Sequence, residues 1–226
     1  NMKKIKVGVI FGGPSSERAV SLVTGKAVCE NLDTKKYTVI PIEMTKDSRF
    51  VGKFKTGARQ IDFVGKDRKV FDVIFIALHG SPGEDGSLQG MFDSLGIKYT
   101  GPGVMASALA MNKVYAAQIY LINGLPHPEF IHFKRDGWKE YKKDVLRDVK
   151  NGVGYPAVIK PVDLGSAVGI SIVKNEKELV TAINKIVKQF PWLIVQKFIK
   201  GQEATCGVLE KKGNIFALPP TRIIAN

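Results

Sequence analysis

The sequence predicts an α/β protein in which an open parallel-sheet domain is followed by an α+β lobe and the truncated start of a second lobe. In the N-terminal part, short runs of β-branched and aromatic residues alternate with helical patterns, which is typical of a parallel sheet with crossover helices. Beyond Thr100-Gly101-Pro102-Gly103, the order changes to paired helices followed mostly by strands. We therefore expect a domain over residues 1–101, a lobe over 102–199 and a truncated lobe over 200–226.

In the first domain, each predicted strand is a short apolar run that ends at a glycine, a proline or a polar turn. The expected strands are 5–11, 37–42, 73–78 and 97–99. A hydroxyl of Ser15 or Ser16 can cap the first helix, which we expect to reach about Leu32, by accepting a hydrogen bond from a first-turn amide. A short second helix is expected from about Leu88 to Leu95.

The remainder is expected to begin with two helices, over residues 104–110 and 113–122. An amphipathic helix is predicted where the apolar side chains of Trp138, Tyr141, Val145 and Val149 share one face. A later helix opens with Asn175 and carries Glu178 three residues on, an Asn version of the capping box. The expected strands are 129–133, 157–160, 170–174, 193–198, 205–211 and 215–218.

The composition is that of an ordinary globular chain and excludes several classes. Of 226 residues, 44% are apolar and 24% are charged, and no apolar run approaches the roughly 20 residues that cross a bilayer. Cys29 and Cys206 are far apart and have no partners at metal-binding spacing. A disulfide framework is therefore not expected, and the cytoplasm is the expected compartment.

The formal net charge of +13 makes polyanions a class of partner to consider. Basic residues are concentrated only from Arg49 to Lys69, where seven basic and two acidic residues are interleaved with Phe50, Phe54 and Phe63. Such a patch can bind nucleic acid. Because no recognition helix or base-stacking motif accompanies it, the favoured interpretation is a solvated irregular segment with a few core-facing aromatics.

The first candidate site is the segment FGGPSSERAVSL, Phe11 to Leu22, where a glycine turn leads from a strand into a helix. Backbone amides at such a helix start attract anions, and glycines let a ligand approach the backbone closely. Glu17 has two interpretations. It is either an acid that complements the helix dipole or a carboxylate that holds the ammonium group of a ligand.

The second candidate site is ALHGSPGEDGSLQG, where a strand runs into His79 and a loop with Glu84 and Asp85 follows. Ligands of an open parallel sheet lie beyond the carboxyl ends of its strands, where we expect His79. His79 is either structural or part of a binding site in which Glu84 fixes the orientation of its ring.

The third candidate site combines Lys113, Lys160 and the glycine loop of residues 163–171. Pro161 holds Lys160 in an extended conformation, so the ammonium group can project from a strand end toward whatever the loop covers. Loop amides and Ser166 beside lysine charges form a suitable cradle for phosphates. A single lysine is usually solvated, but two lysines beside such a loop favour nucleotide binding.

The fourth candidate site is the segment Trp192 to Leu209, where residues 196–203 separate two apolar strands. One interpretation is a hinge-like crossing that offers backbone groups and the carboxylate of Glu203 to a ligand. The other is an edge hairpin with solvent-facing polar residues.

In this order, GGPSSERAVSL, HGSPGEDGSLQG, YTGPGVMASALAMNK and KPVDLGSAVGIS followed by QKFIKGQE closely resemble the D-alanine:D-alanine ligases of the ATP-grasp superfamily. The resemblance covers essentially the whole chain. It implies a nucleotide held between two α+β lobes behind a small open-sheet domain. It also implies ATP-dependent ligation of two D-alanines through a D-alanyl phosphate for peptidoglycan synthesis, with Mg²⁺ or Mn²⁺ on the phosphates, and a homodimer.

By position, the resemblance assigns Glu17 and Ser166 to the catalytic site. Glu17 would bind the ammonium group of the first D-alanine, and His79, oriented by Glu84, would line the same subsite. The implied ATP-binding residues are Lys113 and Lys160 on the phosphates, Gly165, Ser166 and Ala167 over them, Gln196, Lys197 and Ile199 beside the adenine, and Glu203 on the ribose hydroxyls.

Two positions depart from the family's usual residues. Ala167 stands where the family usually has a second serine, and Gln196 replaces a common glutamate. The Gln196 carbonyl can still accept a hydrogen bond from an adenine amino group, though without a charge. We therefore expect weaker nucleotide affinity with unchanged specificity, and stronger ATP binding by Gln196→Glu in calorimetry.

The resemblance also places the family's metal-binding acids, an arginine and an ordering loop beyond Asn226, and residues 211–226 contain no Asp or Glu. Magnesium prefers carboxylates together with substrate phosphates. We therefore expect no metal ligands in this chain, one wall of the ATP site and an incomplete catalyst. The alternatives are an ATP-grasp ligase that joins D-alanine to a hydroxy acid, and a non-catalytic module that binds nucleotides or polyanions.

Overall fold

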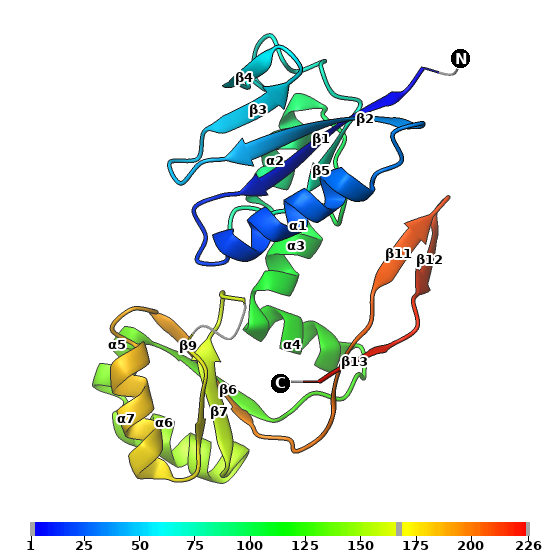
Figure 1. Cartoon of the computed structure of the whole chain (residues 1–226). Helices are drawn as coiled ribbons and strands as arrows, with labels where there is room; N and C mark the ends of the chain where they lie inside the picture. The colour runs from blue at the N-terminus through cyan, green and yellow to red at the C-terminus, as the bar shows by residue number, and fades with distance from the viewer. Residues whose placement is uncertain (1–2, 166–168, 225–226) are drawn as a thin grey trace.

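A five-stranded sheet forms the N-terminal domain in the computed structural model, which describes residues 3–165 and 169–224 (Figure 1). The strand order is β4-β3-β2-β1-β5, in which β1 pairs in parallel with β2 and β5, and β3 and β4 add an antiparallel hairpin at the β2 edge. The strands are β1 (Ile5–Gly12), β2 (Tyr37–Met44), β3 (Phe50–Phe54), β4 (Gly57–Gln60) and β5 (Val73–Ile76). The predicted open parallel sheet is confirmed, whereas residues 97–99 contribute only a bridge from Tyr99 to Ile74.

Two helices, α1 (Arg18–Asn31) and α2 (Ser87–Leu95), cover opposite faces of this sheet. Successive side chains of a strand point to opposite faces. In β1, Val9 therefore packs in the cluster on the α1 side, while Ile10 packs with Phe92 of α2. The carboxyl ends of β1 and β5 meet at one edge, where the first two candidate sites begin.

The start of α1 differs from the expectation. Neither Ser15 nor Ser16 caps the helix, because Glu17 occupies the cap position and makes no side-chain capping bond. The hydroxyl of Ser15 instead accepts a hydrogen bond from the Glu17 amide at 3.0 Å, so it stabilises the turn before the helix.

The basic segment from Arg49 to Lys69 was expected to be irregular. It instead contains the β3–β4 hairpin. The expectation of core-facing aromatics is confirmed: Phe63 is buried, and Phe50 and Phe54 pack against the same core cluster. Arg59 donates two hydrogen bonds to the buried carboxylate of Asp67, at 2.8 and 2.7 Å, and its guanidinium group lies over the Phe54 ring. Part of the positive charge is thus used within the fold.

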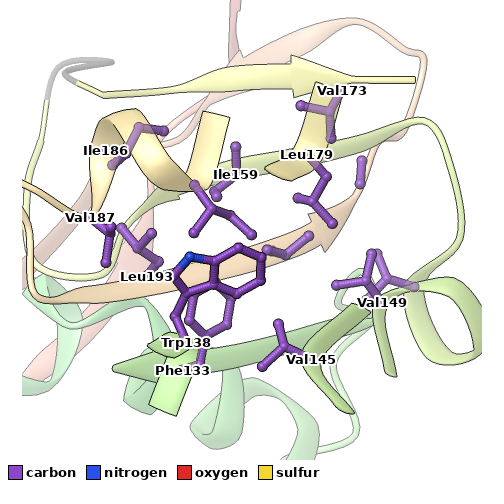
Figure 2. Packing of buried hydrophobic residues seen from close by; sticks show 14 residues of the cluster. Phe133, Trp138, Val145, Val149, Ile159, Val173, Leu179, Ile186, Val187 and Leu193 are labelled. Carbon is purple, nitrogen blue, oxygen red and sulfur yellow. The ribbon is translucent and has the colours of Figure 1, made fainter. Parts of the chain in front are cut away.

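A four-stranded antiparallel sheet of order β6-β9-β7-β8 forms the central lobe. Its strands are β6 (Phe130–Lys134), β7 (Ala157–Pro161), β8 (Ser171–Val173) and β9 (Trp192–Lys197). One face packs against α5 (Arg135–Glu140), α6 (Lys142–Asp148), a π-helical turn (Val149–Val153) and α7 (Glu176–Ile186). Figure 2 shows the resulting core, in which the Trp138 and Phe133 rings lie 5.9 Å apart.

The expected amphipathic helix over residues 138–149 is broken. Tyr141 is exposed and adopts a non-helical φ of −115° between α5 and α6, so it does not share the apolar face. Trp138, Val145 and Val149 are buried, as predicted. The predicted cap of α7 is confirmed for Asn175, whose side chain accepts a hydrogen bond from the Glu178 amide at 2.9 Å. The Glu178 carboxylate accepts from the Lys174 amide and the Asn175 side chain, and not from the Asn175 amide as in a full capping box.

The opposite face of the central sheet packs against α4 (Lys113–Ile122), which follows α3 (Val104–Met111). Val114 of α4 lies in a small buried cluster with Val162 and Ile194. The segment after β9 forms two antiparallel pairs of exposed strands, so the single strand expected over residues 205–211 is in fact two. These strands are β10 (Glu203–Thr205), β11 (Val208–Lys211), β12 (Asn214–Ala217) and β13 (Thr221–Ile223). Over the described ranges, no helix has the length and apolar character needed to cross a bilayer.

Candidate functional site

A polar stripe of α1 lies at the carboxyl ends of β1 and β5. Ser21 and Thr24 follow the cap residue Glu17 by four and seven residues, a spacing that places all three on one side of a helix. Ser21 is fully buried. Its hydroxyl accepts from the Gly12 amide and donates to the Ala77 carbonyl, both at 2.8 Å, which ties the ends of both strands to the helix. Glu17 and Thr24 are thereby held on either side of this anchor.

The Glu17 carboxylate lies where three loops meet. A Cβ atom added to Gly80, after β5, would lie 3.0 Å from Glu17 Oε2, and one added to Gly165, after β7, would lie 2.9 Å from it. Because glycine has no Cβ, both loops can approach the carboxylate closely. The structure therefore brings together the first candidate site, the second and the start of the third. Ser166 and Ala167, which were also predicted here, lie outside the described residues.

His79 is held by a residue that the sequence analysis missed. Its Nε2 atom lies 2.9 Å from the hydroxyl of Thr24, while the Glu84 carboxylate accepts a hydrogen bond from the Gly80 amide at 2.6 Å. The expected orientation of His79 by Glu84 is therefore wrong. Gly80, with a φ of +69°, turns the chain so that the carboxylate closes on the amide and not on the ring. The helical spacing of Thr24 from Glu17 is the signal that would have revealed it.

Two half-buried lysines form the cationic part of the site. Lys113 begins α4 and donates hydrogen bonds to the carbonyl oxygens of Leu164 and Val162, while Lys160 lies on β7. Burial lowers the pKa of both amines, and the charge of Lys160 lowers the pKa of Lys113 further, against the opposite effect of Asp163. In the part of the chain that the structure describes, neither lysine forms an ion pair with a carboxylate. Two desolvated like charges of this kind are suited to a polyanionic ligand such as phosphate.

Gln196 shares a sheet face with Lys160. In the pairing of β7 with β9, Lys160 is opposite Ile194 and Val158 is opposite Gln196, so alternation places these four residues on the face away from the main core. Gln196 is buried, and its amide nitrogen lies 3.2 Å from Nε2 of His127, another residue that the sequence analysis missed.

The remaining predicted nucleotide residues lie on and after β9. Lys197 pairs with the exposed Glu129 carboxylate at 3.4 Å. Ile199 is 63% exposed, and Glu203 begins the exposed strand β10. This segment is exposed to solvent.

A cavity of about 510 Å³ lies at the junction of the two folded parts. Its lining includes Glu84 and Gln89 from the N-terminal domain and Lys113, Leu164 and Gly165 from the central lobe. Cavities of about 300–1,000 Å³ hold small molecules in many proteins. The start of the glycine loop, Lys113 and residues of the N-terminal domain thus line a space of suitable size.

The described residues do not fit a metal site. Within residues 3–165 and 169–224, no group of three or more His, Cys, Asp or Glu side chains could hold a metal ion. Magnesium ligands are mainly carboxylates and phosphates, and among the described residues Asp163 is the acid whose charge acts on the pKa of Lys113. No chemical step is therefore assigned to a metal held by these residues.

The chain has the features of the ATP-grasp class of proteins. They are an open parallel-sheet domain, an antiparallel lobe with two desolvated lysines, and a glycine loop where the domain and the lobe meet. Within that class, a model of the D-ala D-ala ligase N-terminus matches residues 6–102, and a model of the D-ala D-ala ligase C-terminus matches residues 120–226. The chain belongs to the D-alanine–D-alanine ligase family.

Individual relatives agree with this assignment. A D-alanine–D-alanine ligase of Geobacter sulfurreducens is 38% identical over 93% of this chain and 60% of its own length. One of Caldicellulosiruptor bescii is 35% identical over 99% of this chain and 68% of its own length. A crystal structure of the Bacillus anthracis D-alanine–D-alanine ligase complexed with ATP has a TM-score of 0.74 and 31% identity, and the match covers 98% of this chain and 67% of that one. The chain thus spans about 60 to 68% of the length of these relatives.

Proposed function

We propose that this chain provides the first-substrate site and one wall of the nucleotide site of an ATP-dependent D-alanine–D-alanine ligase, which serves peptidoglycan synthesis. The observation that carries the proposal is the meeting of the Glu17 carboxylate with Gly165, at the start of the loop that Lys113 holds by its bond to Leu164. Under this proposal, an anionic group would receive an amine close to the loop that a cationic group for phosphates holds. The crystal structure of the Bacillus anthracis relative, which is complexed with ATP, supports nucleotide binding as part of the proposal.

The arrangement suits ligation through an acyl phosphate. A carboxylate oxygen of D-alanine attacks the γ-phosphorus of ATP, and the bond to ADP breaks. The amine of a second D-alanine then attacks the acyl carbon, and phosphate leaves as the peptide bond forms. Phosphoryl transfer depends mainly on positioning and charge neutralisation. Glu17 would hold the ammonium group of the first D-alanine, and Lys113 and Lys160 would neutralise the phosphates.

The other roles belong to the same proposal. His79 and Glu84 would line the D-alanine subsite, and Gly165, Ser166 and Ala167 would cover the phosphates. Lys197 and Ile199 would flank the adenine beside Gln196, and Glu203 would bind the ribose hydroxyls. The proposal also includes a substrate domain over 1–101, a central ATP-grasp lobe over 102–199 and the start of a second lobe from residue 200. It further includes a homodimer and a cytoplasmic location. The family matches over residues 6–102 and 120–226 support a boundary near residue 102.

Calorimetric titration with D-alanine in the presence of a non-hydrolysable ATP analogue tests the substrate site. We expect saturable binding that Glu17→Gln weakens by about 10-fold or more, because a hydrogen bond to a charged group contributes about 1.5–3 kcal/mol. Glu30→Gln, an exposed acid on the same helix, is the matched control and should bind like the unchanged chain. Equal binding by Glu17→Gln would contradict the assignment. Salt-sensitive binding of DNA that ATP does not displace would instead favour a polyanion-binding module.

The affinity for ATP is expected to fall as the pH rises toward and through the lowered pKa values of Lys113 and Lys160. Burial lowers both pKa values, and the charged amines bind phosphate, so the decline begins at a lower pH than for a surface lysine titrating near about 10.4. Dissociation constants measured by calorimetry across the alkaline range would show it. Lys160→Arg keeps its charge over that range and should reduce the decline, whereas identical profiles would contradict the role of Lys160.

A further inference from the structure

The side-chain amide of Gln196 is held by a histidine from outside its own strand. Gln196 is 7% exposed on β9, and its Nε2 atom lies 3.2 Å from Nε2 of His127, in the segment between α4 and β6. The other ring nitrogen of His127, Nδ1, lies 2.8 Å from the carbonyl oxygen of Pro128. These two contacts involve every nitrogen atom of both side chains.

The contact with Pro128 fixes the hydrogen positions. A carbonyl oxygen only accepts, so Nδ1 of His127 must carry the proton that it donates. In the neutral ring, Nε2 is then an acceptor. The amide nitrogen of Gln196 is a donor and matches it, whereas the amide oxygen in that position would face a lone pair. His127 thus selects one of the two orientations of the Gln196 amide.

The selected orientation turns the carbonyl oxygen of Gln196 away from His127. Among the described residues, no side chain or backbone group donates a hydrogen bond to this oxygen, and it is not enclosed. On the face that Gln196 shares with Lys160, it is therefore available to a hydrogen-bond donor of a ligand. A glutamate here would present two equivalent acceptors, but a glutamine needs a partner to decide which end faces the ligand.

We propose that His127 is a positioning residue that makes the site selective for 6-aminopurine nucleotides over 6-oxopurine nucleotides. The inference rests on the proposed function, in which Gln196 lies beside the adenine. With the amide held by His127, its oxygen accepts from the 6-amino group of ATP. It repels the 6-oxo group of ITP, since both are acceptors. A rotated amide would present its NH₂ group and donate to ITP instead.

The ring of His127 is itself held by packing, which allows a conservative test. It contacts the Phe130 ring edge-on at a centroid distance of 5.3 Å and the Tyr120 ring at 6.1 Å. Phe130 is the residue opposite Gln196 in the pairing of β6 with β9. Substitution by phenylalanine keeps an aromatic ring in this cluster and removes both ring nitrogens.

The test compares the dissociation constants of ATP and ITP for the unchanged chain and for His127→Phe by calorimetry. We expect the preference for ATP to fall by about 3- to 10-fold in His127→Phe, the range that follows from about 0.5–1.5 kcal/mol for one hydrogen bond. The change comes from weaker ATP binding together with stronger ITP binding, because the released amide can rotate. A general loss of structure would weaken both nucleotides and leave their ratio unaltered.

Two controls isolate the amide orientation. His132→Phe makes the same substitution two residues along β6 from Phe130, opposite Ile194 and on the same sheet face, and should leave the ratio unchanged. In a Gln196→Glu background, the carboxylate has only acceptors, so adding His127→Phe should not alter the ratio. Gln196→Glu alone is expected to bind ATP more tightly than the unchanged chain.

The outcomes separate this inference from the function on which it rests. An unaltered ratio in His127→Phe, or an equal drop in the Gln196→Glu background, overturns the role of His127 and leaves nucleotide binding in place. Absence of ATP binding by the unchanged chain overturns the nucleotide site itself, and this inference with it. A lowered ratio that requires Gln196 supports the inference.

Discussion

Lys160→Met is expected to weaken ATP binding by about 10- to 100-fold, the loss that follows from about 1.5–3 kcal/mol for a hydrogen bond to a charged group. The same substitution is expected to make the protein more stable. A loss of ATP affinity together with a gain in stability would show that the charge of Lys160 serves ligand binding and not folding.

The reason for the gain in stability lies in the environment of Lys160. Burial lowers its pKa, so the folded protein holds this proton less tightly than the unfolded chain does. Between the folded and unfolded pKa values, the unfolded chain binds more protons, and stability therefore rises with pH there. Below the folded pKa the full penalty of the buried charge is present. Methionine removes the charge and its repulsion of Lys113 while it keeps a long apolar chain.

Thermal denaturation and ATP titration of the same preparations measure both effects. A gain of about 1 kcal/mol would raise Tm by about 2–4 °C in a protein of this size. Lys174→Met is the matched control, because Lys174 is exposed beyond the end of β8, and it should alter neither quantity. If Lys160→Met lowers Tm and leaves the affinity for ATP unchanged, Lys160 is structural and the phosphate site lies elsewhere.

The sequence predicted the elements whose signal is local. The strands β1, β2 and β5 are short apolar runs bounded by turns, and the Asn175 cap of α7 uses residues three positions apart. The β3–β4 hairpin was missed because charged residues interrupt its apolar pattern. Only the folded structure shows that its aromatic residues pack against the core. Tyr141 interrupts a helical pattern that is otherwise regular, and nothing in its local sequence requires the break.

The candidate site shows the same division between residues marked by local sequence signals and contacts that depend on the fold. Glu17, His79 and Lys160 could be proposed because a glycine turn, a strand end or a following proline marks each of their segments. Their partners could not, since those contacts join distant segments. Thr24 meets His79 across 55 residues of sequence, and His127 meets Gln196 across 69. Only the folded chain shows which neighbour orients each ring or amide.

Gly25→Ala is expected to destabilise the protein, although alanine normally stabilises a helix by about 0.5–1 kcal/mol relative to glycine. Gly25 is buried in α1, and an added Cβ would overlap the side chain of Phe11 on β1. Overpacking of this kind costs about 1–3 kcal/mol, which exceeds the gain in helix propensity. Chemical denaturation should therefore show a lower midpoint. Gly137→Ala in α5 is the matched control, because nothing lies within 4 Å of its added Cβ, and it should stabilise the protein.

The position of α1 links this stability effect to the site. Thr24 directly precedes Gly25, and Glu17 occupies the N-cap position of the same helix, so a helix displaced from β1 moves the groups that hold His79 and the expected ammonium ligand. Gly25→Ala should therefore weaken D-alanine binding as well as folding. A lower denaturation midpoint with unchanged D-alanine binding in Gly25→Ala would mean that the distance between α1 and β1 does not set the geometry of the site.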